Sequence, residues 1–359
     1  MTDRSGQSTN LSDPRFVTRW FQHRLADLSP GASAVIATKV TRLTRGVSRQ
    51  TWTVDAEVDG RPCSFVVRRD HETGTVIPTR LEDEYFVYRR LNDVPVPTAR
   101  ALWFEDDPEW QPDGRACFVR EMIEGSWELP FINDDSPEYD ELRIAHSKEH
   151  LSKLAALHTA DWKAHGFDEI FAVPSTPADA AATLIQANLA VIAGFQFEPA
   201  PAVAEGVANL LATAPTDVPC VSLCKGTNGY GEEVWSDGQI VAMSDWELAC
   251  LGDPAYDFAQ LQDMIPTIVR DGRPLWGWPQ ALDYYTSLSG IPITMERVQF
   301  YRAVNGLLQF QYTHNSAAQV RNHGLRDLRF VWTGWENSFR SNIRLAQEFG
   351  FEPEGSRIA

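Results

Sequence analysis

The segment from residue 244 to 259 holds three aspartates at positions suited to chemistry. Asp245 directly follows an apolar run, Ile240 to Met243, which predicts a strand. A carboxylate at a strand end suits Mg²⁺, which proteins hold with one or two carboxylates plus phosphate oxygens. Asp253 precedes a proline and is expected to cap the next helix. Asp257, one turn further on, is expected to brace the preceding loop through hydrogen bonds.

The elements that precede this segment predict a β-rich region with one helix. From about residue 35 to 70 apolar and polar residues alternate, and Asp59-Gly60 between two such runs is a strong hairpin signal. Residues 80–92 follow a helical period, and a further pair of strands is predicted to follow and to end at 116–122.

After Gly125 the pattern becomes mainly helical. A helix is predicted over about 137–162, and the stretch from Tyr256 to Phe351 is expected to be helical and aromatic. Between them a short β-like island surrounds a glycine-rich loop.

These patterns predict an α+β fold in a bilobal arrangement. The expected parts are an N-terminal extension with a helix over 1–34, a small β-rich lobe over 35–124 and a large, mainly helical lobe over 125–359. A cleft between two such lobes is a common place for a small ligand to bind.

Composition excludes several classes of protein and partner. The 359 residues are 43% hydrophobic and 23% charged, which is typical of a globular protein and excludes disordered and fibrous classes. The formal charge of −17 repels nucleic acid and anionic membrane surfaces, so neither is expected as a partner.

Targeting signals and paired cysteines are not evident. The first 15 residues lack an apolar core, and no stretch approaches the roughly 20 apolar residues of a membrane span. The five cysteines lack zinc-like spacing and are expected to be free thiols. We therefore expect a cytoplasmic protein.

The aspartate segment carries a specific resemblance. Asp245-Trp246-Glu247, then Gly252-Asp253-Pro254 and Asp257, resemble the DWE-x-GDP-x-x-D-L-A signature of the aminoglycoside phosphotransferase family, which belongs with the choline-kinase-like small-molecule kinases. The similarity extends over roughly residues 35–345. It implies a protein-kinase-like fold that uses ATP and Mg²⁺ to phosphorylate a hydroxyl group of a small molecule.

The resemblance also implies residues that bind the nucleotide phosphates. Gly46 and Ser48 lie in a stretch similar to the family's Gly-Ser turn over the ATP phosphates, with Arg45 in place of one glycine. Arg68 resembles the strand cation that binds phosphate, and Glu84 the helix glutamate that pairs with it.

The same resemblance places the adenine and the metal ion. Residues 119–125 resemble the hinge, where backbone groups of Glu121, Met122 and Ile123 are expected to meet adenine. Asp245 matches the family's metal ligand.

The catalytic loop departs from the family pattern, which is His-Gly-Asp, four residues, then Asn. Counting back 18 and 13 residues from Asp245 gives Thr227 at the position of the catalytic base and Glu232 at that of the Asn. Lys225 replaces the His. Glu232 retains an oxygen ligand, so it is predicted to bind the metal with Asp245. Glu233 or Glu232 could substitute as base, and Lys225 could brace the γ-phosphate.

Three functions remain open at this point. The first is an active phosphotransferase with an altered loop, because phosphoryl transfer depends mainly on positioning and charge stabilisation. Its acceptor would be a hydroxyl-bearing small molecule, with an aromatic or apolar body suggested by the aromatic C-terminal third. The second is a nucleotide-binding pseudokinase or regulatory protein, which the Thr227 substitution favours. The third is an aminoglycoside kinase.

Overall fold

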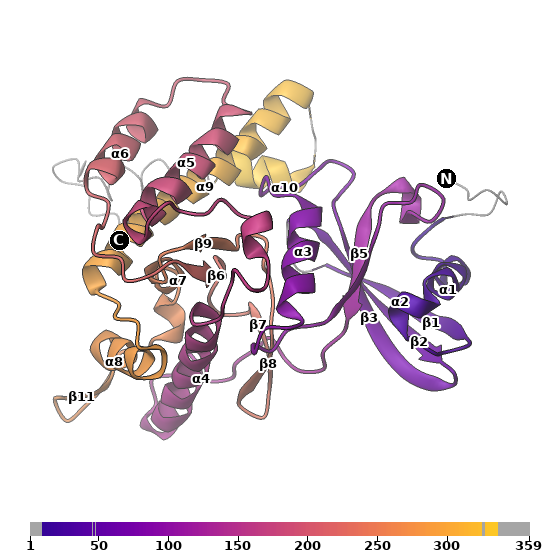
Figure 1. The fold of residues 1–359 in the computed structure, drawn as a ribbon, viewed down its shortest axis with the longest axis horizontal. Helices are drawn as coiled ribbons and strands as arrows, with labels where there is room; N and C mark the ends of the chain where they lie inside the picture. Colours follow the sequence, from indigo (N-terminus) through magenta and orange to yellow (C-terminus); the bar gives the residue numbers. More distant parts are fainter. Residues whose placement is uncertain (1–8, 45, 47, 325–326, 337–359) are drawn as a thin grey trace. The chain divides into compact units, whose positions relative to one another are not determined.

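The computed structural model describes residues 9–44, 46, 48–324 and 327–336, which form two compact units (Figure 1). The first unit comprises the chain up to Thr75, together with Thr79–Asp93 and Thr98–Glu124. The second comprises Val76–Pro78, Val94–Pro97 and the chain from Gly125 onward. The predicted α+β class is confirmed.

The first unit is built on one five-stranded antiparallel sheet. Its strand order is β1 (Val35–Leu43), β2 (Gln50–Val58), β3 (Arg61–Arg69), β5 (Cys117–Glu121) and β4 (Ala101–Glu105). The predicted hairpin is confirmed: β2 and β3 are joined by Asp59 and Gly60, which have φ of 48° and 77°. Positive φ at both central residues matches the right-handed twist of the flanking strands.

Two faces of this sheet pack against different helices. On one face α1 (Pro14–His23) and α2 (Leu25–Leu28) contribute to a core that includes Trp20, Phe65 and Val67. Because successive residues of a strand point to opposite faces, Arg68 lies on the other face. The helix α3 (Leu81–Leu91), which confirms the predicted helix, contacts β4 and β5.

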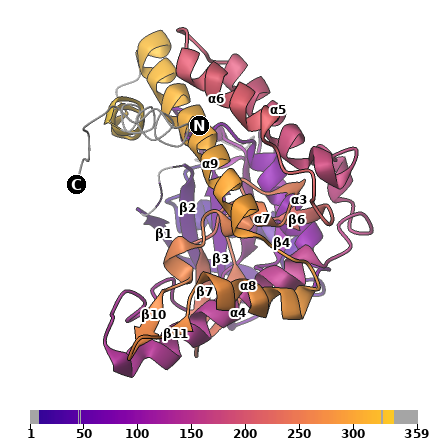
Figure 2. The ribbon, with the colours of Figure 1, turned by 90° about the vertical axis from the view of Figure 1, so that its left-hand side faces the viewer.

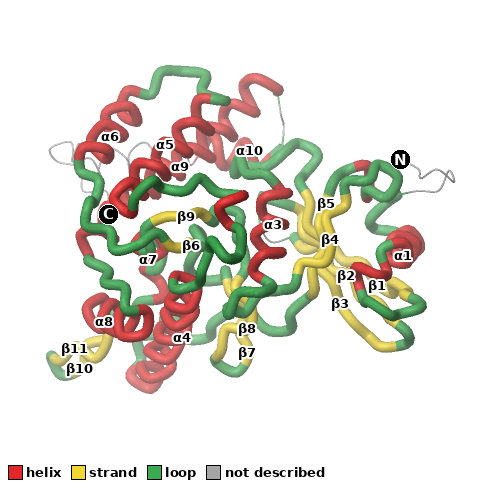
Figure 3. Tube along the Cα trace, viewed as in Figure 1, coloured by secondary structure: helices red, strands yellow, loops and turns green. Residues whose placement is uncertain are grey.

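The second unit is mainly helical, as the red segments of Figure 3 show. Its described α-helices are α4 (Asp140–His158), α5 (Ala180–Ala193), α6 (Pro201–Ala212), α7 (Ala255–Phe258), α8 (Trp278–Ser289), α9 (Met295–His323) and α10 (Leu328–Val331). Shorter turns are η1 (Pro112–Gly114) in the first unit and η2 (Pro137–Tyr139), η3 (Phe167–Glu169), η4 (Pro177–Asp179), η5 (Gln262–Met264) and η6 (Trp332–Glu336) in the second.

The core of this unit forms around the long helix α9, which contacts α5, α6 and α7 (Figure 2). Tyr256, Tyr285 and Tyr301 are among its largest fully buried side chains. Among the helices that the structure describes, none has the length and apolar character needed to cross a bilayer.

Three two-stranded sheets complete the second unit: β6 (Ser222–Cys224) with β9 (Cys250–Gly252), β7 (Glu233–Ser236) with β8 (Gln239–Met243), and β10 (Ile268–Arg270) with β11 (Arg273–Trp276). The stretch from Tyr256 onward is helical as expected in α7 to α10, and the β10–β11 hairpin departs from that expectation. Residues 337–351 of that expectation lie outside the described residues.

Candidate active site

The β7–β8 hairpin brings Glu232 and Asp245 together. Its register pairs Glu233 with Met243, so Glu232 lies opposite Ser244. The backbone N–H and the hydroxyl of Ser244 both donate to the Glu232 carbonyl, at 3.1 and 2.6 Å. Asp245, the next residue, has a φ of 63°, and its side chain is hydrogen-bonded to that of Glu232. A non-glycine residue with positive φ is uncommon and is held there by its surroundings.

The two carboxyl groups of this pair perturb each other. Burial, followed by the charge of Asp245, raises the pKa of Glu232 to about 7. Two adjacent carboxylates repel when both are ionised, and a divalent cation removes that repulsion. The donor set is oxygen only, which is what Mg²⁺ prefers. These residues therefore fit the metal ion that the sequence predicts.

Lys225 is enclosed rather than open to a ligand. Its side chain is fully buried, with the ammonium 3.2 Å from the Glu233 carboxylate and bonded to the Thr227 carbonyl. It also lies 5.9 Å from the centre of the Trp246 ring. Although burial lowers the pKa of Lys225, the charges of Glu233, Asp245 and Glu232 raise it overall. The ammonium therefore stabilises the loop as a buried cation.

Glu233 and Thr227 are not placed as bases. Glu233 is 1% exposed and lies between Lys225 and His150, whose Nε2 is 3.7 Å away. Burial lowers the pKa of His150, which favours its neutral form. The Thr227 hydroxyl donates to the Asp245 carbonyl and so fastens the loop to the aspartate. An acceptor hydroxyl cannot reach a carboxylate that is enclosed in this way.

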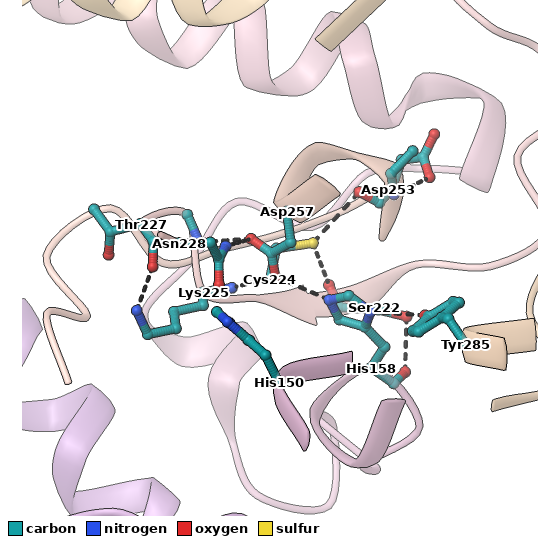
Figure 4. A network of polar contacts seen from close by, with 12 residues as sticks. His150, His158, Ser222, Cys224, Lys225, Thr227, Asn228, Asp253, Asp257 and Tyr285 are labelled. Atoms are coloured by element: carbon teal, nitrogen blue, oxygen red, sulfur yellow. Dashed lines mark hydrogen bonds and ion pairs between the residues drawn. The ribbon is translucent and has the colours of Figure 1, made fainter. Parts of the chain in front are cut away.

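Asp257 braces the loop, as the sequence predicts. Its carboxylate accepts from the backbone N–H groups of Lys225 and Gly226, each at 2.8 Å, and from the Asn228 side chain at 2.9 Å. His158 contacts it through Nε2 at 2.9 Å and contacts the Tyr285 hydroxyl through Nδ1 at 2.7 Å. Figure 4 shows Asp257 between the loop and His158. Burial raises the pKa of Asp257, but the bonds from His158 and the loop lower it overall.

Asp253 begins the next turn and fixes it to α9. Its side chain accepts from the Ala255 N–H at 2.9 Å, although the N-cap residue of α7 is Pro254 and not, as predicted, Asp253. It also accepts two bonds from the buried Arg297 guanidinium, the Nε bond at 3.0 Å. The pairing of Asp253 with Arg297 was not predictable from the sequence, because the two residues are 44 positions apart.

In the first unit Glu84 holds two arginines. The Arg68 Nε lies 2.8 Å from Glu84 Oε1, so the predicted partners are in contact. Arg49 Nη1 lies 3.2 Å from Glu84 Oε2, and its guanidinium also bonds Asp70 and the Thr79 carbonyl. Sequence reasoning missed Arg49, and its place directly after Ser48 was the only signal. Arg49 is fully buried, whereas the Arg68 side chain is 16% exposed. Arg68 is therefore the member of the cluster that a ligand can reach.

The remaining nucleotide-binding candidates also belong to the first unit. Gly46 has a φ of 92° and lies in open space, and Ser48 is buried. Arg45, the replacement for a family glycine, lies outside the described residues.

The hinge candidates continue β5, an interior strand of the sheet that pairs with β3 and β4. The Glu121 N–H donates to the Arg100 carbonyl at 3.0 Å, and the Met122 N–H to the Ser64 carbonyl at 3.1 Å. Met122 is exposed and Ile123 half-buried. Strand pairing therefore fixes the backbone as far as Met122.

Several solved structures resemble this fold. A protein from Ralstonia eutropha JMP134 assigned as an aminoglycoside phosphotransferase aligns with a TM-score of 0.66 and 19% identity, over 94% of this chain and 98% of that one. A thermostable mutant of the aminoglycoside phosphotransferase APH(4)-Ia, solved with AMP-PNP and hygromycin B, gives 0.55 and 16%, over 95% and 99%. The macrolide 2'-phosphotransferase MphH from Brachybacterium faecium gives 0.51 and 20%, over 86% and 99%.

Sequence comparison alone gives no relative: no protein-family model and no curated protein matches the chain. The structural alignments nevertheless extend over nearly the whole of each chain. The chain therefore has the fold of the aminoglycoside and macrolide phosphotransferases, and the predicted resemblance to that group is confirmed at the level of the fold.

Proposed function

We propose that the protein is an ATP- and Mg²⁺-dependent phosphotransferase that acts on a hydroxyl group of a small molecule. The observation that carries this proposal is the Glu232–Asp245 carboxyl pair at the end of the β7–β8 hairpin. The fold supports it, because APH(4)-Ia, a protein of the same fold, was solved with AMP-PNP and with hygromycin B.

Each group of candidate residues has a role in this proposal. In the first unit, Arg68, oriented by Glu84, binds the phosphates together with the turn at Gly46 and Ser48. Backbone groups of Glu121, Met122 and Ile123 bind the adenine. In the second unit, Asp245 and Glu232 would hold Mg²⁺, which when bound offsets the negative charge of the phosphates.

The reaction moves one phosphoryl group. The acceptor oxygen forms a bond to the γ-phosphorus, the bond from that phosphorus to the β,γ-bridging oxygen breaks, and ADP leaves with the bonding electrons. The acceptor proton passes to an oxygen of the transferred group. We assign no side chain as general base. Glu233 and Lys225 are buried and form an ion pair with each other, and the Thr227 hydroxyl is bonded to the Asp245 carbonyl.

The absence of an assigned base favours an acidic acceptor. A missing general base slows such reactions by about 10²–10⁴-fold unless the acceptor loses its proton easily. A phenol or enol meets this condition better than an aliphatic alcohol. We therefore expect phenols to be the better acceptors.

The test is ADP release on a panel of phenols, alcohols and amino sugars, preceded by a thermal shift with ATP and Mg²⁺. We expect Asp245→Asn to lose at least 10²-fold in turnover, because the variant lacks one of the two charged ligands. The matched control is Asp237→Asn, in the exposed turn of the same hairpin, which should leave turnover unchanged. Full turnover by Asp245→Asn would exclude the proposed metal site.

A nucleotide-binding pseudokinase is the second candidate. It is favoured by Thr227, which stands at the position of the family's catalytic base. The hydroxyl of Thr227 donates to the Asp245 carbonyl and so makes a structural contact there. A thermal shift with ATP and Mg²⁺, without turnover of any acceptor in the panel, would support this candidate instead.

A further inference from the structure

A cavity of about 320 Å³ in the second unit is lined by two arginines. Arg143 comes from α4 and Arg302 from α9, and Trp278 at the start of α8 lies beside them. Asp263, an exposed residue, is the one carboxylate among the residues that line it. Counted over its lining residues alone, two arginines and one aspartate, this cavity has a formal charge of 2 − 1 = +1 in a protein whose formal charge is −17.

Arg143 is fixed with its charge directed into this region. It is 5% exposed, and its Nε donates to the Ile132 carbonyl at 3.1 Å. Its Nη2 lies 3.1 Å from Asp135, whose side chain is 87% exposed. A solvated carboxylate is a weak partner that an incoming anion can displace. The guanidinium is therefore held by the backbone, while its counterion is exchangeable.

Arg302 presents a flat guanidinium beside an aromatic ring. Its Cζ lies 4.9 Å from the centre of the Trp278 ring, within the range of a cation–π contact. A guanidinium that is held in one plane is suited to the two oxygens of a carboxylate or phosphate. The two arginines therefore form a site for an organic anion.

A second cavity, of about 510 Å³, adjoins the first and is lined by one residue of the catalytic loop. It shares Ile132 and Asn133 with the first cavity and is also lined by Leu129, Phe131, Asp134, Asp135 and Tyr230. Tyr230 lies in the loop between Lys225 and Glu232, and it is exposed. A molecule bound by the arginines can therefore extend past Leu129 and Phe131 to Tyr230, in the loop that precedes Glu232.

The segment that carries Phe131 is held by several contacts. Phe131 has a φ of 66°, and its ring stacks on Tyr139 at 4.0 Å. Arg270 bonds both carboxylate oxygens of Asp140, at 2.6 and 2.7 Å, and the carbonyl of Asp135 at 2.7 Å. A site whose walls are fixed before binding loses less free energy in ordering its own groups.

We propose that the acceptor is an organic anion, whose carboxylate or phosphate group binds Arg143 and Arg302. Its apolar body lies against Leu129, Phe131 and Tyr230, and its hydroxyl group faces the 225–233 loop. Only the position of the hydroxyl rests on the proposed function, because the anion site is defined by the arginines alone.

The test compares 3-(4-hydroxyphenyl)propanoate with its neutral amide by calorimetric titration, without nucleotide or metal. We expect the acid to bind at least 10-fold more tightly than the amide. Arg302→Gln should remove this difference, and inorganic phosphate should compete with the acid. Arg273→Gln, an exposed arginine of β11 outside the cavity, is the matched control and should change nothing.

Other outcomes overturn the proposal. The first is that the wild-type protein binds the acid and the amide equally, or binds neither. The second is that Arg302→Gln still prefers the acid over the amide. If the acid were bound at Arg68 instead, Arg302→Gln would keep its preference for the acid. Arg302→Gln should retain the thermal shift with ATP and Mg²⁺, which controls for folding. Asp245→Asn should retain the acid's affinity, so failure of the phosphotransferase proposal is distinguishable from failure of the anion site.

Discussion

The Glu232–Asp245 pair makes the stability of the protein depend on pH. An unfolded glutamate has a pKa of about 4.3, whereas Glu232 in the fold titrates at about 7. Between these values the folded protein holds a proton that the unfolded chain has released. Stability must therefore fall as the pH rises through this window, unless a cation takes the place of the proton.

Glu232→Gln is expected to remove this dependence. Without metal, the melting temperature of the wild-type protein should fall between pH 5 and 8, and that of the variant should change less and be higher at pH 8. Mg²⁺ should stabilise the wild-type protein at pH 8 but not the variant. Scanning calorimetry measures both effects, with the exposed Glu205→Gln in α6 as control. An unchanged response to Mg²⁺ in Glu232→Gln would show that this residue is not a ligand.

Lys225→Met tests whether the buried lysine is structural. The change leaves the Glu233 carboxylate buried without its cation, which costs about 3–5 kcal/mol in the free energy of unfolding. The double variant Lys225→Met/Glu233→Leu removes both charges and should recover most of that loss. Urea unfolding measures both. A single variant as stable as the wild-type protein would contradict the buried ion pair.

Among individual residues, the sequence predicted those that belong to a motif and missed those that do not. Asp245 was found from its place after a predicted strand, Arg68 and Glu84 were found from the resemblance to the phosphotransferase family, and the predicted Arg68–Glu84 contact is present. Arg49 was not found, because its partners come from three separate segments that only the fold brings together. The roles of all these residues in binding or catalysis stay predictions.

Three hairpins of the molecule turn at the dipeptide Asp-Gly. These turns are Asp59-Gly60, Asp237-Gly238 and Asp271-Gly272, and each of their six residues has a positive φ. The first was predicted because long alternating strands flank it. The third was missed because β10 and β11 have only 3 and 4 residues, too few to interrupt a helical and aromatic pattern. The turn residues were the better signal there.

Gly226→Ala is expected to disrupt the loop that carries Lys225 and Thr227. Gly226 has a φ of 80°, and a Cβ would lie 2.0 Å from the Leu248 carbonyl oxygen. Gly238 has a φ of 76° with open space around it, so Gly238→Ala carries the backbone cost of about 1 kcal/mol without the clash. Gly226→Ala should therefore lose clearly more stability and all turnover. Equal unfolding free energies for the two variants would contradict the close packing of the loop on Leu248.

At the scale of the whole molecule, the period of the apolar residues was enough to predict the class of fold. Alternation in the first part and helical spacing in the second distinguish a sheet unit from a helical one. The facing of the helices was not predictable, because it depends on packing between distant segments. The arginine cavity is made by α4, α8 and α9 and was missed for that reason. The net charge did not predict this cavity either, because it averages over such local sites.

The thiols provide a test of the whole fold. Cys63, Cys117, Cys220, Cys224 and Cys250 are all free. We expect five thiols to react with Ellman's reagent in denaturant without a reductant. In the native protein Cys117 and Cys224 should react most slowly, because burial shields them and raises the pKa of each thiol. Fewer than five thiols in denaturant, or rapid reaction of these two in the native protein, would contradict the structure.

The course of the chain makes the two units inseparable by one cut. Residues Val76–Pro78 and Val94–Pro97 group with the second unit although they precede Glu124. The Asn315 side chain bonds the Val76 carbonyl at 2.9 Å, and the Met243 N–H bonds the Pro97 carbonyl at 2.7 Å. A protease that cleaved only after Glu124 would leave Val76–Pro78 and Val94–Pro97 covalently attached to the N-terminal fragment. Both segments would still be packed against the C-terminal fragment. The nicked halves would have to be purified together, and neither could be expressed alone with all of its native contacts.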